Sequence, residues 1–180
     1  MISNKDMQIS KGLAPIYDVF VPLNTSVLGK IGLFTGTMPQ LNSLSANITQ
    51  AATITVAQLL ADLGVLQAQF LGNINFTSAV TRKPVINHDV VARKIAVSFN
   101  NITTDLIGVA AGTPTFFIAV GTASVGTDAS SWAAFISGGN AYSVIIGTVG
   151  DEDSNAEMKL VGGKIAVGQG YRFTELAISY

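Results

Sequence analysis

The chain contains no cysteine and little charge for its length. Of its 180 residues, 12% are charged, against about 25% in a typical soluble domain. The absence of cysteine excludes disulfides, thiolate nucleophiles and cysteine-ligated zinc. Hydrophobic residues make up 48% of the chain. The chain therefore has few charged side chains with which to hydrate its surface. Composition therefore favours one medium-sized domain that covers part of its apolar surface with other protein chains.

Long apolar runs and clusters of basic residues are also lacking. No window reaches the ~18 consecutive apolar residues that a membrane-spanning helix needs. Ten basic residues are scattered against eleven acidic ones, and the adjacent basic pairs are Arg82-Lys83 and Arg93-Lys94. The first residues, 1–11, have no apolar stretch typical of a secretory signal. We expect synthesis in a cytoplasm and neither nucleic acid nor a membrane as a partner.

Residues suited to catalysis are scarce. The sole histidine, His88, is followed by Asp89, but neighbouring residues of a strand point to opposite faces, so Asp89 is poorly placed to orient it. The chain has no Gly-x-Ser-x-Gly elbow, no Gly-x-Gly-x-x-Gly motif and no Walker loop. We therefore expect a protein that is not an enzyme and binds no cofactor.

One acidic stretch resembles the beginning of a calcium loop. Residues 151–155 read Asp-Glu-Asp-Ser-Asn, which places oxygen ligands at alternate positions. The sixth loop position is Ala156 instead of glycine, and the twelfth is Gly162 instead of a bidentate glutamate. These two departures favour a solvated acidic turn without a metal ion.

A single short helix is predicted after Thr55. Thr55 and Gln58 have the spacing of a capping box, and Gly64 stands where a left-handed terminal residue is suited. The apolar residues of one helical face are Val56, Leu59, Leu60 and Leu63. A stripe of this size favours a lid over the open end of a β-sandwich.

The rest of the chain has the pattern of strands. Residues 30–35 alternate, with Ile31 and Leu33 on one face and Lys30 and Phe34 on the other. Residues 116–120 are apolar on both faces, which predicts a central strand. In residues 90–100, the side chains predicted to point inward are Val91, Ile95, Val97 and Phe99.

Two further strand patterns lie near the carboxyl end. Residues 132–136 and 141–149 flank Ser137-Gly138-Gly139-Asn140, which predicts a hairpin with a tight turn. The segment 164–167 also has strand character, and a final strand is expected at the carboxyl terminus. Between them the apolar phase changes near Thr174 and Glu175, which predicts a bulge, a sheet corner or a turn.

The amino-terminal segment has an apolar run between two prolines, Pro15 and Pro22. Proline favours an edge strand or an extended arm over a central strand. Its large apolar residues, predicted to contact another subunit or a capsid, are Ile16, Tyr17, Val19, Phe20 and Val21. We therefore predict two parts: an arm or edge strand over residues 1–28, and a single β-sandwich domain over residues 29–180. On this reading, a chain lacking residues 1–23 folds but no longer assembles.

The predicted fold class is all-β, a β-sandwich or jelly roll with one short helix and an extended amino-terminal arm. Residues 30–39, Lys-Ile-Gly-Leu-Phe-Thr-Gly-Thr-Met-Pro, resemble a turn found in small virion structural proteins of tailed bacteriophages. Residues 111–117, 146–150, 158–160 and 165–171 are similar to the carboxyl-terminal strand series of the same proteins.

The resemblance implies a subunit of a phage particle, made in the host cytoplasm and located in the virion. A capsid decoration or cement protein is the first expectation, with the major capsid protein and further copies of itself, as a trimer, for partners. A tail-tube or other tail subunit is the alternative. A further alternative is a soluble ligand-binding β-sandwich. A stable monomer in a measurement of mass in solution would favour this alternative.

Overall fold

The computed structural model describes Ile16, Val19, Phe20, Ile102 and the ranges 29–40, 54–77, 82–89, 91–92, 94–100, 106–122, 129–173 and 175–179. The strands are β1 (Gly29–Phe34), β2 (Ile54–Thr55), β3 (Phe70–Phe76), β4 (Val85–Asp89), β5 (Lys94–Ser98), β6 (Leu106–Ile107), β7 (Phe116–Thr122), β8 (Asn140–Gly150), β9 (Met158–Lys159), β10 (Gly170–Tyr171) and β11 (Glu175–Ser179). The helical elements whose bounds the structure describes are α3 (Val56–Asp62), α4 (Trp132–Ile136) and the 3-10 turn η2 (Gln67–Gln69). The all-β prediction is confirmed.

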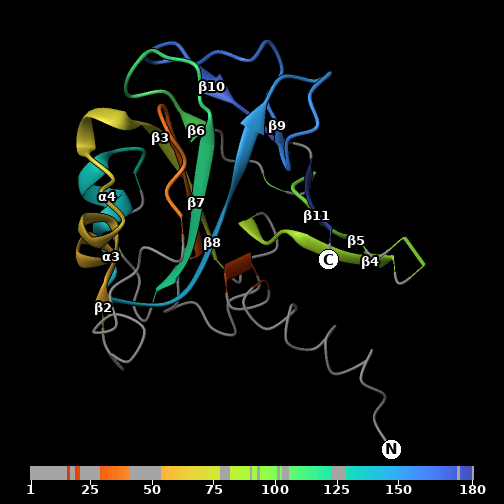
Figure 1. Cartoon of the computed structure of the whole chain (residues 1–180), viewed down its shortest axis with the longest axis horizontal. Helices are drawn as coiled ribbons and strands as arrows, with labels where there is room; N and C mark the ends of the chain where they lie inside the picture. The colour runs from red at the N-terminus through yellow and green to blue at the C-terminus, as the bar shows by residue number, and fades with distance from the viewer. Residues whose placement is uncertain are drawn as a thin grey trace, which may run out of the picture.

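The described strands form one nine-stranded sheet and one small sheet. The large sheet has the order β3-β1-β7-β8-β9-β11-β5-β4, with β2 paired to β8, and the small sheet joins β10 to β6. All pairs are antiparallel except β8 and β9, which run parallel. Figure 1 shows the long strand β8 passing from the group β3-β1-β7 towards the group β9-β11-β5-β4. The jelly-roll topology stays a prediction.

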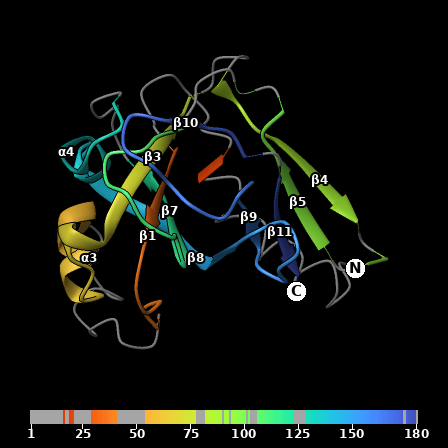
Figure 2. The same cartoon turned by 90° about the horizontal axis from the view of Figure 1, so that it is seen from above.

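Two apolar cores lie on opposite faces of β1 and β7. One core contains Ile31 and Leu33 of β1 together with Val97 of β5 and Leu176 of β11, so the two ends of the sheet share it. The other core lies between Phe34 and the two helices. Figures 1 and 2 show α3 and α4 together on one side of the β3-β1-β7-β8 group. Both faces of β1 and β7 are therefore covered, and every residue of these strands is buried.

The predicted capping box begins α3. The Thr55 hydroxyl accepts a hydrogen bond from the Gln58 amide at 3.2 Å, and the Gln58 side chain accepts one from the Thr55 amide at 3.0 Å. Val56, Leu59 and Leu60 are buried against the sheet. Gly64 follows the helix with a φ of 69°. The helix packs on one face of the sheet, and its apolar stripe is the surface buried in this contact.

Replacing Thr55 with alanine should lower the free energy of unfolding by about 1 kcal/mol, because the first turn of α3 loses its hydroxyl acceptor. Urea denaturation followed by circular dichroism measures the change. Thr55→Ser keeps the hydroxyl and serves as the control. Equal stability of the alanine and serine variants would contradict a stabilising cap.

The predicted hairpin of residues 132–149 is wrong in its first half. Residues 132–136 form helix α4, whose amino-terminal cap is the Ser131 hydroxyl, bonded to the Ala134 amide at 3.1 Å. The turn itself is as expected, because Gly138 and Gly139 have φ values of 100° and 76°. Strand β8 then begins at Asn140. The connection is helix-turn-strand, and α4 is a short helix that the sequence patterns do not predict.

Three smaller expectations have different outcomes. Val91 does not point inward: it lies in the turn between β4 and β5 and is 96% exposed. Segment 164–167 forms an isolated bridge between Ile165 and Gly112 instead of a strand. The phase change near Glu175 is a change of sheet, because β10 pairs with β6 while β11 pairs with β5 and β9. Thr174 itself lies outside the described residues.

Candidate protein-protein interface

The predicted contact run of the amino terminus packs into its own chain at the three positions described. Ile16, Val19 and Phe20 have helical backbone and are at most 3% exposed, all within the core shared by the two ends of the sheet. The Phe20 ring lies 5.7 Å from that of Phe76 and 6.0 Å from that of Phe99. These three side chains are therefore core residues and not intersubunit contacts. Tyr17 and Val21 lie outside the described residues.

A close backbone approach explains why this segment fits against β1. A Cβ atom built on Gly29 would lie 1.6 Å from the carbonyl oxygen of Val19. The segment can thus occupy its place only because β1 begins with a residue that has no side chain. The expectation of an arm outside the globular core is corrected for the described part of residues 1–28.

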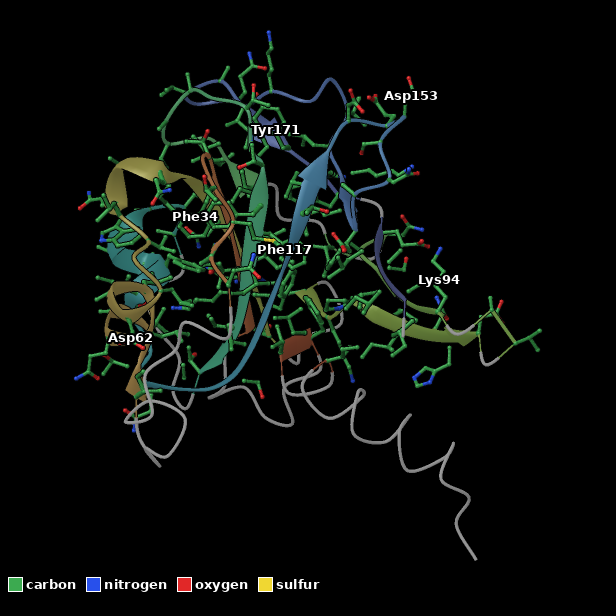
Figure 3. The ribbon with its side chains drawn as sticks, in the orientation of Figure 1. Phe34, Asp62, Lys94, Phe117, Asp153 and Tyr171 are labelled. Atoms are coloured by element: carbon green, nitrogen blue, oxygen red, sulfur yellow. The ribbon has the colours of Figure 1, made fainter. Side chains whose placement is uncertain are left out.

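Four of the exposed aliphatic side chains lie on the two segments that β6 and β10 join. Ile107, Val109, Val161 and Val167 are 40%, 37%, 70% and 64% exposed. They lie on the segments 106–112 and 160–170, at the top of the molecule in Figure 3, where Tyr171 is labelled. We name these four residues the aliphatic end. The sequence patterns do not indicate it, because exposed and buried valines look alike in a strand-like segment.

Backbone hydrogen bonds hold the two segments of the aliphatic end together. The Gly108 amide donates to Gln169 O at 3.0 Å, and the Gly168 amide donates to Gly108 O at 2.8 Å. Gly112 and Ile165 exchange bonds of 3.0 and 2.8 Å. The Ile165 side chain is buried beneath them. The exposed valines and isoleucine therefore lie on two segments whose backbones are held together by hydrogen bonds.

The acidic turn lies beside this end, where Figure 3 labels Asp153. Asp151, Glu152 and Asp153 are exposed. The carboxylate of Glu152 accepts a hydrogen bond from the Gly162 amide at 3.3 Å. The backbone carbonyl of Glu152 accepts one from Lys159 Nζ at 2.9 Å. Within the described ranges, no three His, Asp or Glu side chains are grouped as for a metal ion. The metal-free turn remains a prediction.

His88 lies on β4, opposite Ile95 of β5, and is exposed. The Asp89 carboxylate is occupied by the following turn, where it accepts from the amides of Val91 at 3.0 Å and Ala92 at 2.8 Å. It therefore serves as a turn residue.

Polar side chains on the sheet hold both ends of α4. Asn73 of β3 is buried, and its Oδ1 accepts from the amide of the helix cap, Ser131, at 3.0 Å. Lys30 of β1 is fully buried, and its Nζ donates to the carbonyl oxygens of Ala134 at 2.7 Å and Ser137 at 2.6 Å. Isolated helices of so few residues are unstable. The Asn73 and Lys30 contacts explain why residues 132–136 become helical.

The environment of Lys30 changes its titration. Burial lowers the pKa of Lys30 to about 8, because the charged form loses its hydration. The carbonyl oxygens at the carboxyl end of α4 accept hydrogen bonds from the Lys30 side chain. Asn75 of β3, which lies opposite Lys30 in the β1-β3 pair, is buried and uncharged. The arrangement is a structural anchor within the core.

Comparison of the chain with protein-family models, curated proteins and solved structures found no match. In the parts of the chain that the structure describes, neither helix is long and apolar enough to cross a bilayer.

Proposed function

We propose that this chain is a structural subunit of a bacteriophage particle that decorates or cements the capsid through protein-protein contacts. The aliphatic end is the observation that carries the proposal. Four large aliphatic side chains exposed on two braced segments are suited to burial against another protein. The setting in a virion, with the major capsid protein as the surface to be covered, comes from the motif resemblance of residues 30–39, 111–117, 146–150, 158–160 and 165–171.

The energetic argument is one of apolar burial. Full burial of a valine or isoleucine side chain contributes roughly 1.5–3 kcal/mol. Because the segments are already held by backbone bonds, docking orders little additional chain. Several such side chains, repeated over the many subunits of a shell, would stabilise a particle without a deep pocket or a catalytic group.

Replacing Val109 or Val167 with aspartate should weaken binding to particles at least tenfold, since a charge would be buried in the contact. Particles stripped of the chain are mixed with purified variants, and the bound fraction is measured by cosedimentation. Val91→Asp, an equally drastic change in the β4-β5 turn, should bind as the unchanged chain does.

Unchanged binding of both aliphatic-end variants would contradict the proposed contact surface. Absence of the chain from purified particles by mass spectrometry would contradict the virion role altogether. Binding to tails and not to heads in electron micrographs would favour the alternative of a tail subunit.

A further inference from the structure

Two Val-Gly pairs carry the most exposed side chains of the aliphatic end. Val161 is followed by Gly162, and Val167 is followed by Gly168 six residues further along the chain. Val161 and Val167 are more exposed than the other two members of this surface. The conformation of these two pairs therefore decides how much of the apolar surface a partner meets.

Both pairs form the same kind of turn. The fourth residue of each turn donates its amide to the carbonyl of the first, at 3.0 Å in residues 160–163 and at 3.3 Å in residues 166–169. Gly162 and Gly168, the third residues, have φ values of 75° and 76°. This closing bond and a positive φ at the third position are features of a type II turn. Each valine thus stands at the corner of a turn, in the second position.

A side chain of strand β10 holds the turn of residues 166–169. The Tyr171 hydroxyl accepts a hydrogen bond from the Ala166 amide at 2.6 Å. The backbone of Tyr171 pairs with Leu106 of β6, and its side chain packs against the core shared by the two ends of the sheet. The hydroxyl therefore has a fixed place, and the first residue of the turn is bonded to it.

The same turn is held from a second side by the neighbouring segment. The Gly168 amide donates to the carbonyl oxygen of Gly108. A Cβ atom built on Gly108 would lie 2.3 Å from the carbonyl oxygen of Ala166, so the two backbones can approach only because residue 108 is glycine. Tyr171 and Gly108 together fix both the beginning and the third residue of the turn that carries Val167.

We propose that Tyr171 is a positioning residue of the aliphatic end, whose hydroxyl keeps the Val167 turn in the conformation that meets the partner. The inference rests on the proposed function, because the partner is the same capsid surface. Docking of a preformed turn orders little chain, whereas a turn that opens freely must be ordered at a cost in affinity. Tyr171 therefore acts on binding through Val167.

The first test measures the turn in the free chain. Tyr171→Phe keeps the ring and removes only the hydroxyl acceptor, so the Ala166 amide should exchange with solvent about tenfold faster in NMR hydrogen exchange. The amides of Gly112 and Ile165 bond to each other's carbonyls and should keep their protection. An unchanged exchange rate at Ala166 would overturn the positioning role, whatever the particles bind.

The second test measures binding to particles stripped of the chain. Tyr171→Phe should bind about fivefold more weakly in cosedimentation, because the free turn is less ordered. In a chain that already carries Val167→Ala, the same change should have little further effect, since the side chain that it positions is gone.

A matched pair of glycine variants separates positioning from stability. Gly168→Ala strains the turn without touching Tyr171, because an added Cβ meets no atom within 4 Å while φ is 76°. Gly64→Ala, after α3, has a φ of 69° and an equally open site. Both variants should lose similar stability in urea, but only Gly168→Ala should weaken particle binding.

Equal loss of binding in the two glycine variants would show that binding follows the stability of the whole chain, and it would overturn the inference. So would an effect of Tyr171→Phe that is undiminished in the Val167→Ala chain. The proposed function fails separately: Val167→Asp then binds particles as the unchanged chain does, while exchange at Ala166 still reports the bond to Tyr171.

Discussion

Replacing Phe20 with alanine should lower the free energy of unfolding by about 3–5 kcal/mol. Phe20 is fully buried, and its ring contacts those of Phe76 and Phe99, so the change removes a large side chain and leaves a cavity. Urea denaturation of the full chain measures the loss. Phe20→Leu, which keeps most of the apolar volume, is the control and should cost much less.

The same packing reverses the expectation for a chain lacking residues 1–23. Because Ile16, Val19 and Phe20 contribute to the core, the truncated chain should lose its cooperative unfolding transition and not merely its ability to assemble. A truncated chain with normal circular dichroism, together with a Phe20→Ala variant of unchanged stability, would show that the segment is dispensable for folding.

The second large effect concerns Lys30 and pH. The pKa of Lys30 is about 8 in the folded chain, because burial disfavours the ammonium, against an ordinary value of 10.5. Between these values the unfolded chain binds the proton and the folded chain does not. Stability therefore rises as pH increases from 8 towards 10.5, by up to about 3 kcal/mol. The neutral amine still has two hydrogens for the carbonyls of Ala134 and Ser137.

The measurement compares the unchanged chain with Lys30→Met in urea denaturation at pH 7 to 10. Groups common to both chains cancel in the difference, and the methionine variant lacks the titrating amine. The difference in stability should shift in favour of the unchanged chain as pH rises. A flat difference, or one of opposite sign, would show that the carbonyls keep the pKa of Lys30 at its ordinary value.

The regions predicted well are those whose conformation depends on near neighbours. The capping box of Thr55 and Gln58 is satisfied within one turn, and it forms as the spacing predicts. Residues 116–120 are apolar at every position and are rich in β-branched and aromatic residues, and they form the central strand covered on both faces that this pattern predicts. The turn at Gly138 and Gly139 requires positive φ values that glycine adopts freely.

The residues of the candidate interface could not be predicted from the sequence pattern. The pattern places Val91 inward and does not single out Val109 or Val167, because an aliphatic residue in an alternating segment is typical of a core. Whether it is buried depends on which segments cover it. The pairing of residues 106–112 with 165–170, far apart in the chain, leaves Val109 and Val167 outside.

The sequence by itself determined the all-β class, the helix after Thr55, the central strand and the low charge that favours contact with other chains. Only the tertiary structure decided that residues 132–136 are helical and that Phe20 belongs to the core. The physical reason is that a short apolar run fits a helix or a strand almost equally well. Lys30 and Asn73 hold the two ends of α4 from distant strands, and Gly29 admits the backbone at Val19. These partners meet only when the chain is folded.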